Sequence, residues 1–144
     1  MKIYFHILTV LSLIILSSCT NDYSSDKMVS PSEKYYFITK INRTDKSKDN
    51  YTDVVISLYT VEGKLLTNLN TKAADSNKWA IGWDSKEDII ILNSSDIGTY
   101  SWRIENGEFI EIELTESIRE QAEEILNINL RISDKNCFLP KLRK

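Results

Sequence analysis

Short hydrophobic runs, several of them alternating with polar residues, fill the middle of the chain and predict β-strands. In residues 78–84, Trp79, Ile81 and Trp83 share one face, with small residues between them. Residues 89–92 are instead apolar on both faces, which is typical of a central strand covered on both sides. The pattern predicts an antiparallel β-meander of about six or seven strands, at residues 35–38, 54–61, 64–69, 78–84, 89–92, 99–104 and 108–114.

The hydrophobic period changes to that of a helix over residues 115–130. An apolar stripe at helical spacing usually packs in a core, so we expect this helix to lie on one face of the sheet. A chain of 144 residues also has the length of one domain rather than two. The expected fold class is therefore α+β, a β-meander with one C-terminal helix. The stripe consists of Ile118, Ala122, Ile125 and Leu126.

The last predicted hairpin allows its register to be argued from the apolar pattern. A two-residue turn at 106–107 would pair Trp102 with Glu111, an aromatic side chain with an acid. A three-residue loop at 105–107 would pair Trp102 with Ile110 instead. Because a shift of one residue turns every side chain to the other face, the pattern favours the three-residue loop.

The N-terminal residues have the organisation of a secretory signal peptide. A short positive start is followed by a mostly apolar stretch at residues 3–16. A helix of about fourteen residues reaches only about 21 Å, short of the hydrocarbon core of a bilayer. The stretch is therefore better read as a cleaved signal peptide than as a transmembrane helix.

The sequence Leu16-Ser17-Ser18-Cys19 resembles the lipobox of bacterial lipoproteins. The resemblance implies cleavage between Ser18 and Cys19, and attachment of lipid to Cys19 as the new N-terminus. It covers only this leader, and no family is indicated for the rest of the chain. Acyl chains of this kind would anchor the protein stably to a membrane.

The expected organisation follows from this leader and from the strand and helix pattern. Residues 1–18 are the signal peptide, and residues 19–33 are the lipidated cysteine and a flexible tether. Residues 34–130 form one β-rich domain with its helix at 115–130, and residues 131–144 form a basic tail.

Maturation changes the chemistry that the chain can perform. Cleavage removes the only histidine, His6, and leaves a net charge of about −4. Histidine-dependent catalysis and histidine-ligated zinc are then excluded, and no phosphate-binding or nucleophile motif is present. We therefore expect no enzyme activity, no catalytic or metal-ligating residues and no cofactor. The acidic balance also argues against nucleic acid as a partner.

Acidic residues are concentrated in the last hairpin and the first half of the helix. Residues 105–124 hold eight glutamates against Arg119 as the single basic residue. Such a surface could attract a basic partner, although a solvated hairpin and helix would carry the same residues. The candidate partner face consists of Glu108, Glu111, Glu113, Glu116, Glu120 and Glu123.

A second candidate site combines aromatic and acidic residues near two predicted turns. Tryptophans can stack on a sugar ring, and paired carboxylates can hydrolyse a glycosidic bond. Aspartates are also common turn residues, and tryptophans on alternating strands are usually core. The residues of this candidate ligand patch are Trp79, Trp83, Asp84, Asp88, Asp96 and Trp102.

The sequence therefore predicts a lipid-anchored protein of the cell envelope that acts as a non-catalytic binding module. One alternative is an inhibitor or immunity-type lipoprotein that neutralises a basic enzyme. Another is a carboxylate-based sugar-binding protein or glycosidase. The expected partners are the membrane, through the lipid, and a basic envelope or secreted protein. Thr20, in place of an aspartate after the cysteine, favours the outer membrane in a cell with two membranes.

Overall fold

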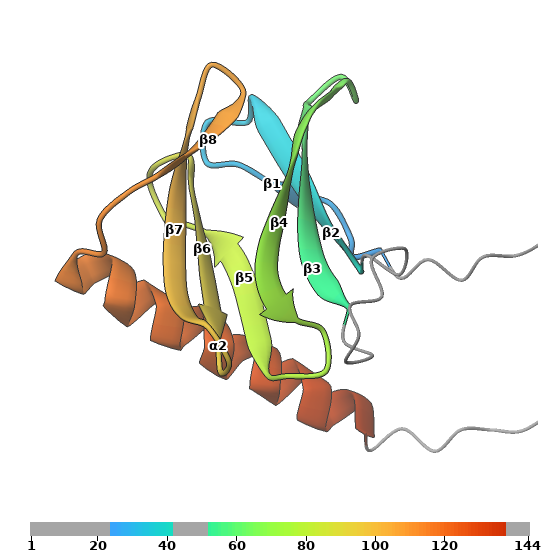
Figure 1. Ribbon diagram of the computed structural model, residues 1–144, viewed down its shortest axis with the longest axis vertical. Coiled ribbons are helices and arrows are strands. Elements are labelled where there is room, and N and C mark those ends of the chain that lie inside the picture. The colour runs from blue at the N-terminus through green and yellow to red at the C-terminus, as the bar shows by residue number, and fades with distance from the viewer. Residues whose placement is uncertain (1–23, 42–51, 138–144) are drawn as a thin grey trace, which may run out of the picture.

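The computed structural model describes residues 24–41 and 52–137, with side chains described as far as Asn129 (Figure 1). The signal peptide and the lipobox with Cys19 lie outside the described residues. The described elements are β1 (Met28–Val29), β2 (Tyr35–Ile41), β3 (Asp53–Thr60), β4 (Leu65–Ala74), β5 (Trp79–Trp83), β6 (Ile89–Ser94), β7 (Gly98–Glu105), β8 (Glu108–Glu111) and α2 (Glu116–Cys137).

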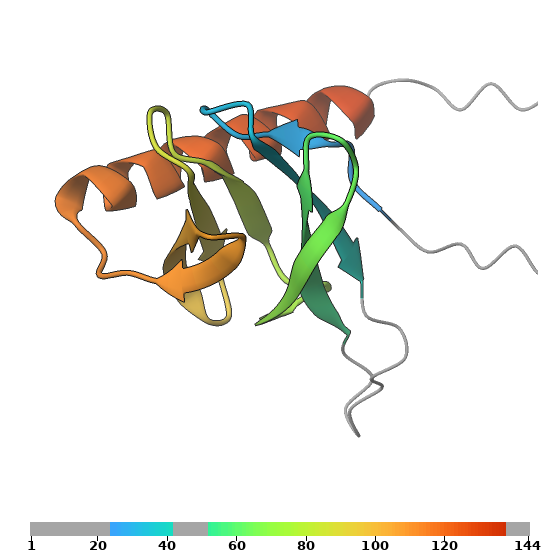
Figure 2. The ribbon, with the colours of Figure 1, turned by 90° about the horizontal axis from the view of Figure 1, so that it is seen from above.

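The strands form two antiparallel sheets rather than the single meander expected. Strands β1 to β4 are neighbours in the first sheet, and β5 to β8 are neighbours in the second. Helix α2 contacts β5, β6 and β7, so it covers the second sheet (Figures 1 and 2). The mostly β fold with one C-terminal helix is confirmed, whereas the sheet count was wrong. Alternation shows which face of a strand is buried, but it does not show which strand lies beside it.

The main core lies between the two sheets. Its buried side chains come from β2, β3 and β4 on one side and from β5, β6 and β7 on the other. Each fully buried aliphatic or aromatic side chain contributes about 1.5–3 kcal/mol. The cluster consists of Phe37, Ile56, Leu58, Ala73, Ile81, Ile90, Leu92, Trp102 and Ile104.

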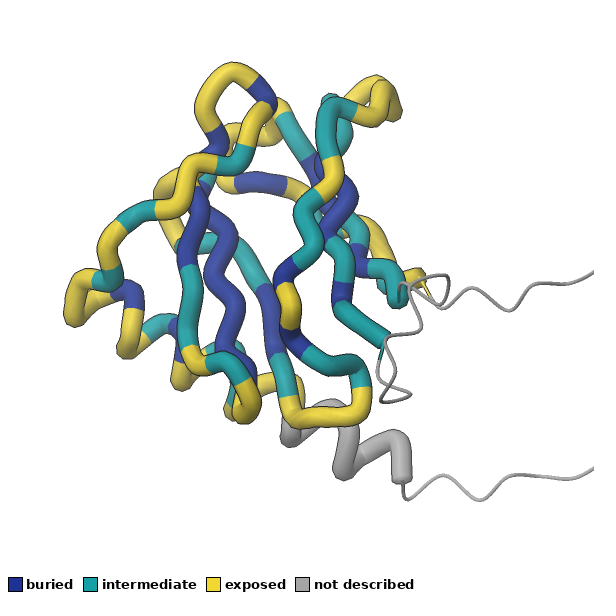
Figure 3. The backbone as a smooth tube through the Cα atoms, viewed as in Figure 1, coloured by how far each residue is buried: buried dark blue, intermediate teal, exposed yellow. Residues whose placement is uncertain are grey.

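A second, smaller core joins the helix to the other face of β6. Ile118 and Ala122 pack against Ile89 and Ile91, as the helical stripe predicted. Strand β6 is therefore covered on both faces, and all six of its residues are buried (Figure 3). The helix also approaches Gly82 closely, since a Cβ there would lie 3.1 Å from the Ile125 side chain.

The last hairpin has the two-residue turn that the apolar pattern disfavoured. Trp102 pairs with Glu111, and Ile104 pairs with Phe109, which packs on the main core. Asn106 and Gly107 both have positive φ, at 53° and 82°, as a type I′ turn requires. Because β8 is a short edge strand, Glu111 remains exposed although it is opposite Trp102. Turn chemistry therefore set this register.

Both ends of the folded region differ from the expected boundaries. The chain joins the first sheet from Ser24 onward, through a bridge to Lys40 and through β1, although residues 19–33 were expected to be a flexible tether. Helix α2 runs to Cys137, past the expected end at residue 130. It therefore includes the first residues of the expected basic tail.

Candidate functional site

Asp84 joins the turn after β5 to the helix. One of its carboxylate oxygens accepts hydrogen bonds from the backbone amides of Lys86 and Glu87, both at 2.8 Å. The other accepts a hydrogen bond of 2.6 Å from Gln121 Nε2 on α2. Burial acts to raise the pKa of Asp84, but these hydrogen bonds outweigh it and lower the pKa. Both oxygens are already occupied in holding the fold.

Asp88, at the other end of the same turn, and Asp96, in the turn between β6 and β7, play similar parts. Asp88 accepts hydrogen bonds from the amide of Ser32, at 3.1 Å, and from its hydroxyl, at 2.5 Å. Asp96 accepts one from the amide of Ala74, at 2.8 Å, and a short one from the Ser94 hydroxyl. Desolvation opposes ionisation of Asp96, but these donors prevail and lower its pKa to about 2.

The three aspartates do not converge on a common site. Asp84 and Asp88 precede β6 whereas Asp96 follows it, so a strand of about 20 Å separates Asp96 from the other two. Asp84 is bonded to α2, while Asp88 is bonded to the turn before β2. A glycosidase needs two carboxylates about 5–10 Å apart across a sugar. The described arrangement provides separate structural links instead.

The three tryptophans of the candidate ligand patch belong to the main core. Trp102 is 5% exposed, and Trp79 and Trp83 pack against the cluster from its margin. The indole nitrogen of Trp83 donates a 2.9 Å hydrogen bond to the carbonyl of Met28, and its ring lies 5.2 Å from that of Phe37. These rings fill the space between the sheets, so the structure does not assemble the patch into a cleft.

The six glutamates of the acidic face have a different setting, because all of them are exposed. They follow one another along β8, the connection at residues 112–115, and the side of α2 opposite to Ile118 and Ala122. Among the described side chains, the two ion pairs are Lys72–Asp53 and Arg103–Glu87, and neither involves these glutamates. The acidic face is Glu108, Glu111, Glu113, Glu116, Glu120 and Glu123.

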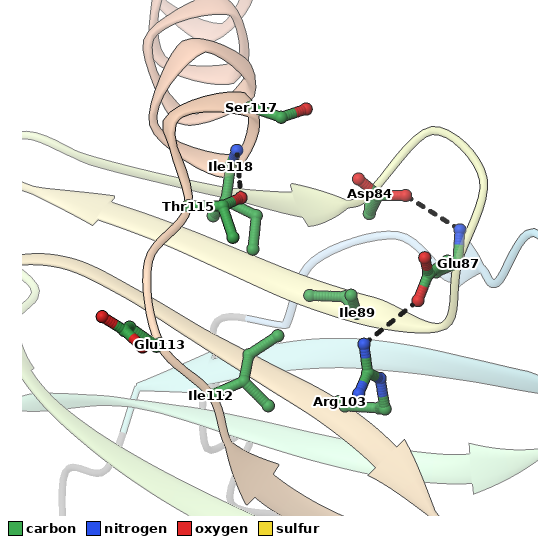
Figure 4. A pocket seen from close by; sticks show the side chains of 9 residues that line it. All are labelled: Asp84, Glu87, Ile89, Arg103, Ile112, Glu113, Thr115, Ser117 and Ile118. Carbon is green, nitrogen blue, oxygen red and sulfur yellow. Dashed lines mark hydrogen bonds and ion pairs between the residues drawn. The ribbon is translucent and has the colours of Figure 1, made fainter.

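Two shallow hollows flank the connection between β8 and α2, and Glu113 lines both. The first has a volume of about 330 Å³ and an apolar floor of Ile89, Ile112 and Ile118. Figure 4 shows the Arg103–Glu87 ion pair, at 3.2 Å, on the side of this hollow away from Glu113. The remaining lining residues of the first hollow are Asp84, Thr115 and Ser117.

The second hollow, of about 370 Å³, lies beside the first residues of β7, Thr99, Tyr100 and Ser101. It brings Glu111 and Glu113 together with the half-buried Tyr100, with Arg119 as its one basic residue. An aromatic ring beside two carboxylates is a suitable setting for an ammonium or guanidinium group. Tyr100 lies beside Glu113 because the two-residue turn sets this register, which the hydrogen bond from the Ile112 amide to the Ser101 carbonyl continues past β8. The apolar pattern favoured the other register, so it did not place Tyr100 or Arg103 beside Glu113.

The fold defines a class, a two-sheet antiparallel β-domain with one covering helix. No protein-family description, curated protein or solved structure matches the chain. Within residues 24–41 and 52–137, no helix is long and apolar enough to cross a membrane. The same residues contain no group of three or more histidine, cysteine or acidic side chains placed to hold a metal ion.

Proposed function

We propose that this protein is a lipid-anchored protein of the cell envelope that binds a basic partner protein without catalysis. The lipobox ending at Cys19 supports the anchor, and the acidic face supports the kind of partner. The observation that carries the proposal is the exposure of six glutamates along three consecutive segments, outside the described ion pairs.

The physical argument rests on exposed like charges along consecutive segments, two of which, Glu111 and Glu113, line one hollow. Neighbouring carboxylates repel each other, and a partner with complementary positive charge relieves that repulsion on binding. Such an interface gains association rate and specificity from charge, and it weakens as salt rises. Binding through the acidic face should therefore depend strongly on ionic strength.

The two hollows give the acidic face places for individual side chains. Glu113 stands between them, so one carboxylate is available to a basic group entering from either side. In the second hollow, Tyr100 adds an aromatic ring that can contact the same group. An arginine or lysine of the partner is the side chain best suited to this arrangement.

A scaffold and an inhibitor would both use this surface. If the partner is an enzyme with a basic active-site entrance, occupation of that entrance by the acidic face makes the protein an inhibitor or immunity-type lipoprotein. If the partner is another envelope component, the same contact makes it a docking module. The activity of the partner, with and without this protein, separates the two.

The test is affinity capture with residues 20–144 as bait, because every described element lies between Ser24 and Cys137. Envelope and secreted proteins of the native cell are the source, at low and moderate salt. We expect one stoichiometric basic partner that is released as salt rises. The variant that reverses charge on the acidic face carries Glu111→Lys, Glu113→Lys, Glu120→Lys and Glu123→Lys.

A matched control makes the same change of net charge elsewhere on the chain. It carries Asp26→Lys, Glu33→Lys, Glu62→Lys and Asp75→Lys, which lie outside the acidic face. We expect the first variant to lose the partner and the control to keep it. Loss in both variants would mean that only net charge matters, and no stoichiometric partner at either salt would contradict the proposal.

A further inference from the structure

The first sheet has an outer face that points away from the second sheet. Phe37, Ile56 and Leu58 belong to the main core between the sheets, so the residues that alternate with them on β2 and β3 point the other way. Helix α2 contacts β5, β6 and β7, and so it covers the second sheet rather than this face. The outer face of the first sheet is therefore a surface that the described helix leaves open.

Four residues form a row across this outer face, one from each strand of the sheet. Val29 of β1 pairs with Tyr36 of β2, which pairs with Tyr59 of β3. Tyr59 in turn pairs with Leu65 of β4, and directly paired residues have their side chains on the same face. The aliphatic side chains at the two ends of the row are exposed, Val29 by 54% and Leu65 by 47%. Between them the two tyrosine rings are stacked, with centroids 5.0 Å apart and planes at 4° to each other.

Two lysines contact the tyrosines of this row. The ammonium group of Lys27 lies 4.6 Å from the centroid of the Tyr36 ring, within the range of a cation–π contact. The ammonium group of Lys40 donates a hydrogen bond of 3.4 Å to the Tyr59 hydroxyl. Neither lysine takes part in the two described ion pairs. These contacts join six residues into one surface, the tyrosine strip, which is Lys27, Val29, Tyr36, Lys40, Tyr59 and Leu65.

The acidic residue on the outer face of β3 has partners within its own sheet. Strand alternation places Asp53 there, at the end of the strand away from Tyr59. Its carboxylate accepts a hydrogen bond of 2.8 Å from Asn70 and lies 3.9 Å from the ammonium group of Lys72. The negative charge of Asp53 is therefore offset locally, and the charged groups in contact with the tyrosines are both positive.

These features indicate what kind of surface covers the strip. A second copy that packed the same strip against itself would bring lysines together, and like charges oppose such a pairing. A sugar would need a free ring face, whereas Tyr36 is 7% exposed and lies between Lys27 and Tyr59. Exposed aliphatic side chains beside tyrosines and lysines suit the boundary of a bilayer, where lysines reach the phosphates and tyrosines lie at the headgroup level.

The place where the described chain begins also favours a bilayer. Ser24 is bridged to Lys40, and the Ser25 amide donates a hydrogen bond of 3.0 Å to the Thr39 carbonyl, so the chain begins beside β2. Cys19 precedes Ser24 by five residues, which span at most about 18 Å when fully extended. A lipid on Cys19 would therefore hold the first sheet close to the headgroups.

We propose that the outer face of the first sheet rests on an anionic bilayer through the tyrosine strip. The aliphatic and aromatic side chains enter the headgroup region, and Lys27 and Lys40 contact the lipid phosphates. In Figures 1 and 2 the first sheet is on the right, whereas β8 and the start of α2 are on the left. This contact therefore leaves the acidic face open to a partner. The inference rests on the lipid anchor of the proposed function and adds an orientation to it.

Vesicle binding by residues 20–144, which lack Cys19, tests the strip apart from the lipid. The probes are vesicles of phosphatidylcholine alone and of phosphatidylcholine with phosphatidylglycerol, and bound protein is measured by co-sedimentation at low salt. We expect binding to the anionic vesicles to be stronger by about tenfold, because lysines close to an anionic surface are attracted to it. Equal binding to both kinds of vesicle, or binding to neither, would overturn the proposal.

A pair of lysine variants shows whether the strip supplies this attraction. Lys27→Gln with Lys40→Gln should weaken binding to the anionic vesicles by about tenfold. The control, Lys78→Gln with Lys86→Gln, makes the same change of charge at two exposed positions beside β5, and it should bind within about twofold of the wild type. Circular dichroism verifies that both variants are folded. Equal weakening in both, or weakening in neither, would contradict the assigned surface.

A second pair of variants tests the aliphatic ends of the strip. Val29→Thr with Leu65→Thr removes exposed apolar area and should weaken vesicle binding by about fivefold. The control, Ile110→Thr with Ile128→Thr, changes two side chains that are similarly exposed, by 43% and 49%, on β8 and α2. It should bind like the wild type, and a loss as large as that of the first pair would contradict the proposal.

Orientation is measured with a fluorophore attached to a single cysteine. Cys137→Ser removes the only thiol of residues 20–144, and Leu65→Cys or Ile110→Cys then places the label on the strip or on β8. A quencher attached to the headgroups should quench the label at 65 more strongly than the label at 110. Equal quenching, or stronger quenching at 110, would overturn the orientation.

The strip, the anchor and the partner can each fail separately. The vesicle assay contains no partner protein, and the affinity capture contains no lipid. Acylation is tested by incorporation of labelled palmitate in cells, with Cys19→Ser as the control, and its absence together with selective vesicle binding would remove the anchor and leave the strip standing. A dimer in sedimentation equilibrium that is lost in Val29→Thr with Leu65→Thr, without vesicle binding, would assign the strip to a second copy and overturn the proposal.

Discussion

The aspartates of the turns and the glutamates of the acidic face are the same kind of chemical group in two different situations. Asp84, Asp88 and Asp96 each accept at least two hydrogen bonds, and each joins segments that are far apart in the sequence. The acidic face takes part in neither of the described ion pairs. A carboxylate bonded by its own protein is a structural element, whereas an exposed one keeps its capacity for a partner.

The tryptophans beside these aspartates strengthen the contrast. Trp83 and Trp102 pack in the core between the sheets, so substituting them changes the free energy of unfolding before it changes any surface. Substitutions in the acidic face should change partner binding and leave the free energy of unfolding nearly unchanged. The comparison can therefore be tested by measuring stability and binding on the same set of variants.

The largest effect on stability is expected from Trp102→Ala. This side chain is 5% exposed and packs among residues of both sheets, so its removal leaves a cavity in the main core. We expect a loss of about 3–5 kcal/mol in the free energy of unfolding, measured by urea denaturation. A loss below about 1 kcal/mol would mean that the indole is not a core residue, which would reopen the ligand patch.

A smaller and pH-dependent effect is expected from Asp96→Asn. The carboxylate is solvent-exposed and accepts bonds from the Ala74 amide and the Ser94 hydroxyl, so we expect a loss of about 1–2 kcal/mol at neutral pH. Folding lowers the pKa of Asp96 from 3.8 to about 2. Ionised Asp96 therefore contributes its full stabilisation at pH values above 3.8. That contribution disappears as the pH falls through about 2.

Urea denaturation of the wild-type protein and of Asp96→Asn, across the acidic pH range, measures this dependence. The difference between the two should be constant above pH 3.8 and should shrink toward pH 2. A difference that does not change with pH would show that the ionised carboxylate contributes nothing to the fold.

The helix allows the contrast to be tested between two neighbouring residues. Gln121 donates to Asp84 from α2, so Gln121→Ala should cost about 0.5–1 kcal/mol in unfolding free energy. Glu120 belongs to the acidic face, and Glu120→Ala should leave stability within about 0.5 kcal/mol of the wild type. Thermal and urea denaturation of both variants check this pair, and equal losses would contradict the distinction.

A small effect on stability for so many substitutions is expected from the combined charge reversal at Glu111, Glu113, Glu120 and Glu123. All four side chains are exposed, so each substitution should change the free energy of unfolding by no more than about 0.5 kcal/mol. Relief of repulsion among the glutamates could even stabilise the domain. Circular dichroism during thermal unfolding measures the change, and a loss as large as that of Trp102→Ala would show that these carboxylates have structural partners.

The sequence predicted the parts of the fold that depend on local periodicity. The double coverage of β6 and the packing of Ile118, Ala122 and Ile125 from the α2 stripe follow from apolar residues at strand and helix spacing, and the structure confirms both. Leu126, the fourth residue of the stripe, is only half-buried.

The sequence did not predict the change of sheet between β4 and β5, because alternation is the same in one sheet or two. The register of the last hairpin was also missed, since Asn106-Gly107 prefers a two-residue turn and β8 is a free edge.

The candidate sites show a similar division. Exposure of the glutamates on α2 could be anticipated from helix periodicity, whereas Glu111 is exposed because β8 is a short edge strand. The partners of the aspartates could not, because Asp84 reaches Gln121 and Asp88 reaches Ser32 across long stretches of sequence. The hollows beside Glu113 depend on the register of the last hairpin, which continues past β8 through the hydrogen bond from the Ile112 amide to the Ser101 carbonyl, and the apolar pattern favoured another register.

The most direct test of the central claim is a fluorescence anisotropy titration with a labelled peptide of alternating arginine and glycine. Three forms of residues 20–144 are compared at equal low salt: the wild type, a glutamate variant and a folded aspartate variant. The glutamate variant carries Glu111→Lys, Glu113→Lys, Glu120→Lys and Glu123→Lys. The aspartate variant carries Asp84→Asn, Asp88→Asn and Asp96→Asn. We predict that the glutamate variant weakens binding by about tenfold or more, while the aspartate variant changes it by less than about twofold. Equal weakening in both, or weakening only in the aspartate variant, would contradict the account.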